Sequence, residues 1–287
     1  MSSIHALRLR LAPWALLLVA ASWGLAFVVM KDSIARQSVN NFLFSRFLLA
    51  AVAMVILRPR VIKLFNKDLL IRGMVAGFFL GSGYILQTLG LERTGVAVTG
   101  FITGLYVVTT PLIAAILFRE KITALTWGCV ALATAGLALL SLHGFAIGFG
   151  ELLVLGSAFA FGAHIICLGR WSNGRDAYAL TVVQISTCAV LAGIASMVEG
   201  GYSLPPDWGV WSTIVFTAII CTAVAFIVQT WSQAYMTTSK VAVILTMEVV
   251  FAALFAILIG GESLTLRIAL GGTAVVTAMY VIVLKEA

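Results

Sequence analysis

The sequence predicts an all-α integral membrane protein: ten transmembrane helices, arranged as two inverted five-helix repeats around a central cavity. Of its 287 residues, 62% are hydrophobic and only 10% are charged, and its mean hydropathy is +1.10. A soluble domain has roughly 45–50% apolar and about 25% charged residues, so a soluble enzyme, a nucleic-acid-binding protein and a disordered scaffold all fit poorly. Ten spanning helices of roughly 20 residues would use about 200 residues, leaving little chain outside the bilayer.

The positive charges support the same class. The formal net charge is +7, but we expect no nucleic-acid partner, because multi-pass membrane proteins collect Lys and Arg in cytoplasmic loops. With a cytoplasmic N-terminus, thirteen of the 18 Lys and Arg residues fall in inner segments and four in outer segments. The last one, Arg46, lies inside the second apolar run, where it either snorkels to the interface or binds a substrate carboxylate. This distribution predicts a multi-pass protein of the bacterial cytoplasmic (inner) membrane, with both termini in the cytoplasm and an even number of helices.

Ten apolar runs define the predicted helices, and none alternates every second residue as the strands of a β-barrel do. The first run continues from Trp23 to Val29, which favours a helix that stays in the protein over a cleaved signal peptide. In chain order the runs cover residues 12–30, 40–57, 69–90, 95–118, 124–142, 150–168, 178–198, 209–230, 239–259 and 266–284.

Two of these runs carry clear packing signals. In the third run Gly73, Gly77 and Gly81 recur every four residues, a pattern that favours close contact between helices. In the fourth run Pro111 lacks a backbone N–H and is predicted to form either a hinge or a static kink.

An internal repeat relates the two halves of the chain. Residues 107–123 read VVTTPLIAAILFREKIT and residues 249–265 read VVFAALFAILIGGESLT, an offset of 142 with six identities. The same offset pairs Gln87 with Gln229. The predicted repeats, residues 1–145 and 146–287, each hold five helices, and an odd number per half implies opposite insertion in the membrane. Secondary transporters built in this way bind substrate near the midplane, between the halves.

Polar residues inside the predicted spans are the candidates for substrate binding, because such groups are costly in lipid and usually face the interior of the bundle. The carboxylate of Glu248 is expected to bind a substrate ammonium or a proton, or else to hydrogen-bond a neighbouring helix. His164 is either a substrate-binding or titrating group, or an interior histidine with satisfied hydrogen bonds. Gln87 and Gln229 either line one cavity or hydrogen-bond between helices.

Aromatic side chains complete the predicted site, since an apolar pocket with a few polar anchors is the usual pattern of a small-molecule site. For each of them, packing or lipid contact is the alternative. The set consists of Trp23, Phe79, Tyr84, Phe101, Tyr106 and Phe161.

The sequence lacks the motifs of other functions. No GxxxxGK[ST], HExxH, GxSxG or CxxC motif occurs, so we expect no ATP, no cofactor, no metal and no catalytic residue. The expected partners are a small-molecule substrate and the lipid bilayer. The oligomeric state stays open, and a monomer fits. A membrane-embedded enzyme would need histidines or acids clustered at one face, and a channel would need rings of like charge or a filter sequence.

Together these features resemble the drug/metabolite transporter superfamily, and within it the EamA-type exporters, over nearly the whole chain. One departure is Val249, which stands where the family has a proline. The resemblance rests on Ser22-Trp23-Gly24, Arg46, Pro111, Arg119-Glu120-Lys121-Ile122-Thr123, Met247-Glu248 and Gly261-Glu262-Ser263-Leu264-Thr265.

The resemblance implies export of amino acids, other metabolites or drugs, and the chain looks most like the amino-acid exporters, the aromatic amino-acid exporter included. The resulting prediction is a secondary transporter that exports small amphipathic metabolites, amino acids above all, by alternating access. Efflux of multiple or cationic drugs is the main alternative. Proton coupling and facilitated diffusion both remain open.

Overall fold

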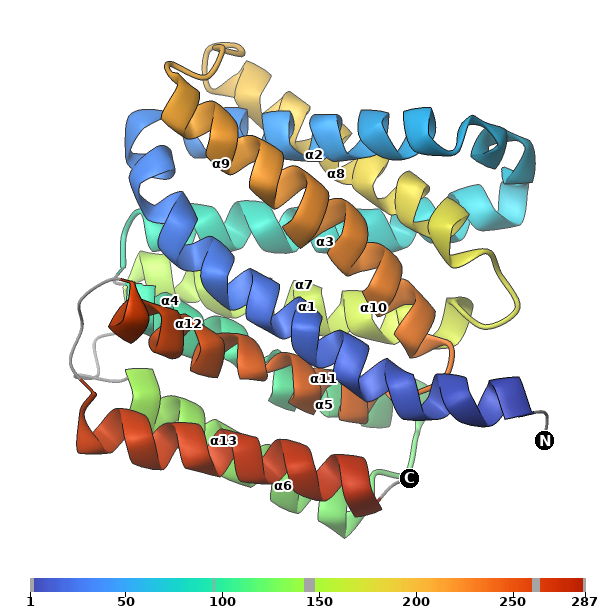
Figure 1. The fold of residues 1–287 in the computed structure, drawn as a ribbon, viewed down its shortest axis with the longest axis vertical. Helices are drawn as coiled ribbons and strands as arrows, with labels where there is room; N and C mark the ends of the chain where they lie inside the picture. Colours follow the sequence, from blue (N-terminus) through green and yellow to red (C-terminus); the bar gives the residue numbers. More distant parts are fainter. Residues whose placement is uncertain (1–2, 95, 142–147, 260–263, 286–287) are drawn as a thin grey trace.

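The computed structural model describes residues 3–94, 96–141, 148–259 and 264–285, and every regular element within them is helical. This confirms the predicted all-α class. The helices lie side by side in one bundle, and the first turn of the first helix and the last turn of the last helix lie toward the same end of it (Figure 1). The predicted repeat boundary between residues 145 and 146 lies outside the described residues.

The elements follow the predicted apolar runs closely. The first six helices and one 3-10 turn are α1 (Ser3–Arg36), α2 (Val39–Leu57), η1 (Pro59–Leu64), α3 (Lys67–Leu91), α4 (Val96–Gly104), α5 (Tyr106–Phe118) and α6 (Ala124–Ser141). The remaining helices and one π-helical turn are α7 (Phe149–Trp171), α8 (Ala177–Val198), α9 (Trp208–Ala218), η2 (Ile219–Val224), α10 (Ala225–Gln233), α11 (Thr238–Leu245), α12 (Met247–Leu258) and α13 (Leu266–Lys285).

Short polar side chains begin several of these helices. Each accepts a hydrogen bond from a backbone N–H in the first turn, which satisfies one of the donors that a helix start leaves unpaired. The caps are Ser38, Asn66, Asp176, Asp207 and Thr237.

The helices suit a membrane in length and composition. In the described part of the chain, seven are long and apolar enough to cross a bilayer. Three shorter apolar helices cover Ile102–Phe118, Ala124–Leu139 and Leu266–Ile282. Many large apolar side chains lie on the outer surface, and Trp208 is 88% exposed. An extended apolar surface of this kind is stable only against apolar surroundings, such as lipid tails.

Three predicted helices are interrupted. The run 95–118 divides at Leu105, where the backbone N–H of that residue donates to the Ile102 carbonyl at 3.1 Å in a tightened turn. The run 239–259 divides at Thr246, where the Val249 N–H donates to the Thr246 carbonyl at 3.1 Å. The third interruption is the π turn η2, which separates α9 from α10. Apolar periodicity does not report such breaks, because each segment on either side stays helical.

The first break also bears on the predicted hinge at Pro111. The helix α5 continues through this proline, which is buried, and the discontinuity lies at Leu105, one and a half turns earlier. A hinge motion at Pro111 therefore stays a prediction. The departure from regular α-helical hydrogen bonding in this run lies at Leu105.

The halves of the chain pack on one another instead of forming separate bundles. The helix α3 contacts α7 and α8, α2 packs on α8, and α1 packs on α12, while α6 and α13 form an outer pair (Figure 1). The predicted glycine ridge lies in the contact between α3 and α8: a Cβ at Gly77 would stand 2.6 Å from the Gln184 carbonyl oxygen. Backbones this close accept no side chain, so the ridge sets how near the two helices lie.

Candidate functional site

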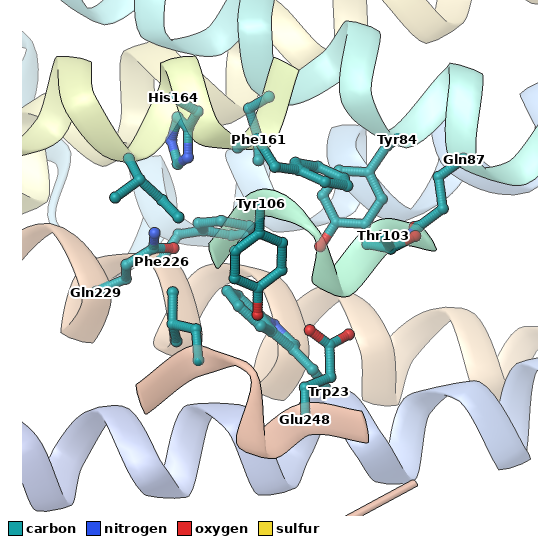
Figure 2. Close-up of a pocket in the computed structure, with 13 residues that line it drawn as sticks. Trp23, Tyr84, Gln87, Thr103, Tyr106, Phe161, His164, Phe226, Gln229 and Glu248 are labelled. Carbon is teal, nitrogen blue, oxygen red and sulfur yellow. The ribbon is translucent and has the colours of Figure 1, made fainter. Parts of the chain in front are cut away.

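A cavity lies in the middle of the bundle, between helices of both halves (Figure 2). The space open to the centres of water molecules is about 40 Å³, which holds roughly three or four waters at ~10–15 Å³ each. A substrate of amino-acid size therefore requires the walls to move apart. The lining residues are Trp23, Leu80, Tyr84, Gln87, Thr103, Tyr106, Phe161, His164, Ile165, Phe226, Gln229, Leu245 and Glu248.

Ten of these thirteen residues form five pairs, and the members of each pair are 142 residues apart. This is the offset of the sequence repeat. Corresponding positions of the two halves thus face the same space. The pairs are Trp23 with Ile165, Tyr84 with Phe226, Gln87 with Gln229, Thr103 with Leu245, and Tyr106 with Glu248.

The helix breaks explain why two of these pairs reach the cavity. Thr103 and Tyr106 flank the break at Leu105, and Leu245 and Glu248 flank the break at Thr246. At both breaks the backbone hydrogen bonding tightens locally to the shorter spacing of a 3-10 turn, and the residues on either side of each break line the same cavity. Discontinuous helices of this kind surround the substrate in many transporter folds.

Eight of the ten residues predicted to bind substrate lie around this one cavity. Phe79 does not: it packs against Ala76, Cys167 and Leu168, beside Phe78. We therefore leave it out of the site. Phe101 belongs to α4, but its side chain lies outside the described residues. The eight are Trp23, Tyr84, Gln87, Tyr106, Phe161, His164, Gln229 and Glu248.

Sequence reasoning missed five lining residues: Leu80, Thr103, Ile165, Phe226 and Leu245. Two signals were available. The repeat offset leads from Tyr84 to Phe226 and from Trp23 to Ile165. Helical spacing places Leu80 one turn before Tyr84, on the same face.

Trp23 is held in the cavity wall by the close packing of the next residue, Gly24, and by a hydrogen bond of its own indole ring. A Cβ at Gly24 would stand 2.7 Å from both the Glu248 carbonyl oxygen and the Ala252 nitrogen, so α1 lies directly against α12 at this point. The indole Nε1 of Trp23 donates to the Cys221 carbonyl at 2.8 Å. That carbonyl belongs to η2, where the π turn alters the regular hydrogen bonding, as is frequent at functional sites.

Arg46 is fully enclosed by protein, which corrects the expectation that it snorkels to the interface. Its side chain is among the largest that are fully buried. Nε donates to Thr222 Oγ1 at 2.7 Å and Nη2 donates to the Cys221 carbonyl at 3.4 Å. The guanidinium also stacks on Tyr84, with its carbon 5.1 Å from the ring centroid. It therefore fixes η2 and one wall of the cavity without lining the cavity itself.

The orientation of Gln229 follows from a chain of hydrogen bonds that ends on the backbone. Gln233 Nε2 donates to the Ile165 carbonyl at 2.7 Å, so its amide oxygen must face Gln229. Gln229 Nε2 donates to that oxygen at 3.1 Å. The Oε1 atom of Gln229 is left buried without a partner. Gln229 therefore presents an unused hydrogen-bond acceptor.

The same logic fixes the tautomer of His164. Gln184 Nε2 donates to the Leu180 carbonyl at 3.2 Å, which leaves the amide oxygen of Gln184 facing the ring. His164 Nε2 lies 2.8 Å from that oxygen and must carry the proton. In the neutral ring Nδ1 is then an acceptor.

Glu248 projects its carboxylate into the cavity, where the hydroxyl groups of Tyr84 and Tyr106 also point (Figure 2). Among the described residues no hydrogen-bond or ion-pair partner contacts this carboxylate. The Tyr106 hydroxyl is likewise buried without a partner. Buried polar groups normally find partners, so the Tyr106 hydroxyl is an exception, and it faces the same cavity as the partly buried carboxylate of Glu248. In the same part of the chain no group of three His, Cys, Asp or Glu side chains could hold a metal ion.

Comparison with known proteins identifies the family. The model of the EamA-like transporter family matches the chain twice, over residues 10–142 and 148–284. An uncharacterized transporter from Archaeoglobus fulgidus is 32% identical over 274 residues, which cover 94% of this chain and 85% of that protein. A protein of known crystal structure superposes with a TM-score of 0.73 at 17% identity over 94% of both chains, a likeness of fold alone. The chain therefore belongs to the EamA-like transporter family, as its resemblance predicts, and is a membrane transporter.

Proposed function

We propose that this transporter is a secondary exporter of small amphipathic metabolites that carry an amine, amino acids first among them and aromatic ones included. It works by alternating access across the cytoplasmic membrane. The observation that carries the proposal is the cavity of five residue pairs, 142 residues apart, with unpartnered polar atoms facing it. In transporters built from inverted repeats the substrate lies between corresponding parts of the two halves.

The proposal includes ten membrane crossings, five in residues 1–145 and five in residues 146–287. Seven long apolar helices together with three shorter ones make this number, and the two family matches divide the chain at the same place. The two broken segments, α4 with α5 and α11 with α12, occupy the fourth place in their halves.

Alternating access requires that either end of the cavity can open. Ion pairs join the halves at both ends of α2: Arg58 to Asp176 at 3.0 Å beyond one end, and Arg36 to Asp207 before the other. Exposed pairs like these are worth about 0–1 kcal/mol each, so they can break and form again during a transport cycle.

The test is counterflow of radiolabelled amino acids in liposomes that contain the purified protein, with and without a pH gradient. We expect saturable flux that Glu248→Gln reduces at least tenfold. Phe79→Leu is the matched control, because Phe79 lies on α3 away from the cavity, and its flux should stay within twofold of wild type. Absence of flux for every amino acid, from protein that elutes as a single folded species, would contradict amino-acid export.

The orientation is tested separately with single cysteines in whole cells. A cysteine at position 199 should react with an impermeant thiol reagent from outside, and one at position 63 should not. The four native cysteines are buried and give a low background. The opposite labelling pattern would overturn the cytoplasmic placement of the termini.

Efflux of cationic drugs is a second candidate, and one observation favours it. The unpartnered carboxylate of Glu248 lies among the rings of Trp23, Tyr84, Phe161 and Phe226, and aromatic faces attract organic cations. Transport of a permanent aromatic cation in the same liposomes, without transport of any amino acid, would favour this function over the first.

A further inference from the structure

We propose that the cavity recognises its substrate through a protonated amine and presents no Lys or Arg side chain to a carboxylate. Amines and amino alcohols would then bind more tightly than the amino acids of the same side chain. The inference deepens the proposed function and rests on it, because it concerns the same cavity. It follows from which hydrogen-bonding atoms of the wall are already used and which are free.

The free atoms accept hydrogen bonds. Gln229 Oε1 is buried without a partner, and its orientation is fixed by the backbone carbonyl of Ile165 through Gln233. The carboxylate of Glu248 has no partner among the described residues, and it can only accept while it is ionised. The Tyr106 hydroxyl, also unpartnered, can accept as well. An ammonium group has three donors and no acceptor, so acceptor atoms of this kind are its partners.

Four side-chain nitrogens of the wall each already donate one hydrogen bond within the protein. Trp23 Nε1 donates to the Cys221 carbonyl at 2.8 Å, and Gln87 Nε2 donates to Thr103 Oγ1 at 3.1 Å. Gln229 Nε2 and His164 Nε2 are held by the side chains of α10 and α8 described above. A carboxylate placed in this cavity would meet the carboxylate of Glu248 and would find only neutral donors, such as the hydroxyl groups of Tyr84 and Tyr106. Leaving a buried charge without a partner is costly.

A cation for the carboxylate is missing as well. None of the described residues that line the cavity is Lys or Arg. The nearby guanidinium of Arg46 does not line the cavity: Nε donates to Thr222, Nη2 to the Cys221 carbonyl and Nη1 to the sulfur of Met30, and its face lies over Tyr84. It therefore does not offer the two parallel N–H groups that hold a carboxylate in a bidentate pair.

The rest of the wall suits an organic cation with an apolar body. Tyr84 lies 5.4 Å from Phe161 and 6.3 Å from Phe226 between ring centroids, and Phe226 lies 5.3 Å from Trp23. In Figure 2 the ring of Trp23 lies beside the Glu248 carboxylate and Phe226 lies beside Gln229, so aromatic rings and acceptors border the same space. Aromatic faces attract cations within about 6 Å of the ring centroid and bury apolar surface at the same time.

The test uses four compounds that share a phenyl ring and differ in the charged groups: 2-phenylethylamine, phenylalaninol, phenylalanine and 3-phenylpropionate. Their binding to the purified full-length protein is measured by calorimetry in detergent. We expect the amine and the amino alcohol to bind at least tenfold more tightly than phenylalanine, and 3-phenylpropionate not to bind. Phenylalanine binding as tightly as phenylalaninol, or detectable binding of 3-phenylpropionate, would overturn the inference.

Two variants show whether the named acceptors cause this preference. Glu248→Gln should reduce the preference for phenylalaninol over phenylalanine to within about threefold, and Glu248→Asp should keep it. The ratio of the two affinities is informative even where both affinities fall, so a general loss of binding does not imitate the result. Phe79→Leu is the control and should leave the ratio unchanged. An unchanged ratio in Glu248→Gln would also overturn the inference.

The outcomes separate this inference from the proposed function. Transport of amino acids with a carboxylate-dependent preference would leave the exporter standing and remove the inference. Tight binding of the amines with no transport in liposomes would keep the inference and contradict the exporter. If none of the four compounds binds to folded protein, the inference is wrong.

Discussion

The two halves supply the cavity with corresponding positions but with different chemistry. At one pair the first half places the phenol of Tyr106 and the second half places the carboxylate of Glu248. At another pair both halves place a glutamine that donates through Nε2, Gln87 to Thr103 and Gln229 to Gln233, and the Oε1 atom of Gln229 is buried without a partner. The comparison indicates that the repeated backbone determines the position of the cavity wall. Single side-chain differences between the halves determine the charge of that wall.

A similar contrast holds in the packing beside the cavity. Gly24 lies directly against the backbone of α12, and the residue 142 positions later is Ile166, a buried side chain. The first half therefore has no room for a side chain at a position where the second half fills space with one. Equivalent sequence positions are thus not interchangeable, and this difference can be tested directly.

The largest effect is expected from giving the first half the residue of the second, as Gly24→Ile. Even a Cβ would stand 2.7 Å from two backbone atoms of α12, which cannot rotate away as a side chain can. We expect loss of the folded, monodisperse protein in size-exclusion chromatography. Ile166→Val is the control, since it should cost only about 0.5–1.5 kcal/mol and stay folded. A Gly24→Ile protein that elutes and melts like wild type would show that the helices are not in this contact.

The next effect concerns the charge difference between Tyr106 and Glu248. A hydrogen bond to a charged group is worth about 1.5–3 kcal/mol and one to a neutral group about 1 kcal/mol. Glu248→Gln should therefore weaken binding of an aromatic amine about 10- to 100-fold, and Tyr106→Phe only about fivefold, in calorimetric titrations. Equal effects of the two substitutions would mean that the halves do not differ in the way proposed.

A smaller effect is expected from the two glutamines. Gln229→Leu removes an unpartnered acceptor that faces the cavity, whereas Gln87→Leu removes a bond to Thr103 within the wall. We expect about a fivefold loss of amine affinity for Gln229→Leu, from one hydrogen bond, and at most a twofold loss for Gln87→Leu. The comparison fails if Gln87→Leu weakens binding more than Gln229→Leu does.

The smallest effect is expected at the end of the bundle, where Asp207 joins α9 to Arg36. Hydrogen bonds from the Val210 and Gly209 backbone and the charge of Arg36 lower the pKa of the Asp207 carboxyl. A carboxyl whose pKa is lower in the folded state than its unfolded-state pKa of about 3.9 stabilises the folded protein at a pH above 3.9. This stabilisation is lost as the pH falls through the folded-state pKa. Asp207→Asn should therefore lower the thermal midpoint slightly at pH 7, and the difference from wild type should shrink as the pH falls below about 3.9. A difference that grows on acidification would contradict this sign.

Much of the fold follows from local properties that the sequence states directly. The ten apolar runs locate the helices, and the glycines of α3 indicate a close contact before any partner is known. The spacing of Tyr84 and Gln87 places them on one face of α3, where both line the cavity. The same reasoning would exclude Phe79, which lies five residues from Tyr84 and so faces about 140° away on a helix of 3.6 residues per turn. Predicting it as a site residue ignored that rotation.

Other features depend on contacts between distant parts of the chain. Arg46 fits snorkelling as long as only its own helix is considered. The structure pairs it with Thr222, 176 residues away, because η2 lies against α2 and covers the guanidinium. The free acceptor of Gln229 is also a tertiary result, since its orientation depends on a carbonyl of α7.

The sequence by itself determined the membrane class, the family, the repeat offset of 142 residues and the identity of the intramembrane carboxylate at Glu248. These depend on composition, periodicity and residue identity, which are properties of each segment alone. Only the tertiary structure decided where the helices break, which side chains meet at the cavity, and which of their polar atoms are left unpaired. Those depend on how helices from both halves approach one another, and a hydrogen-bond partner is fixed by distances between atoms that the order of residues along one helix does not contain.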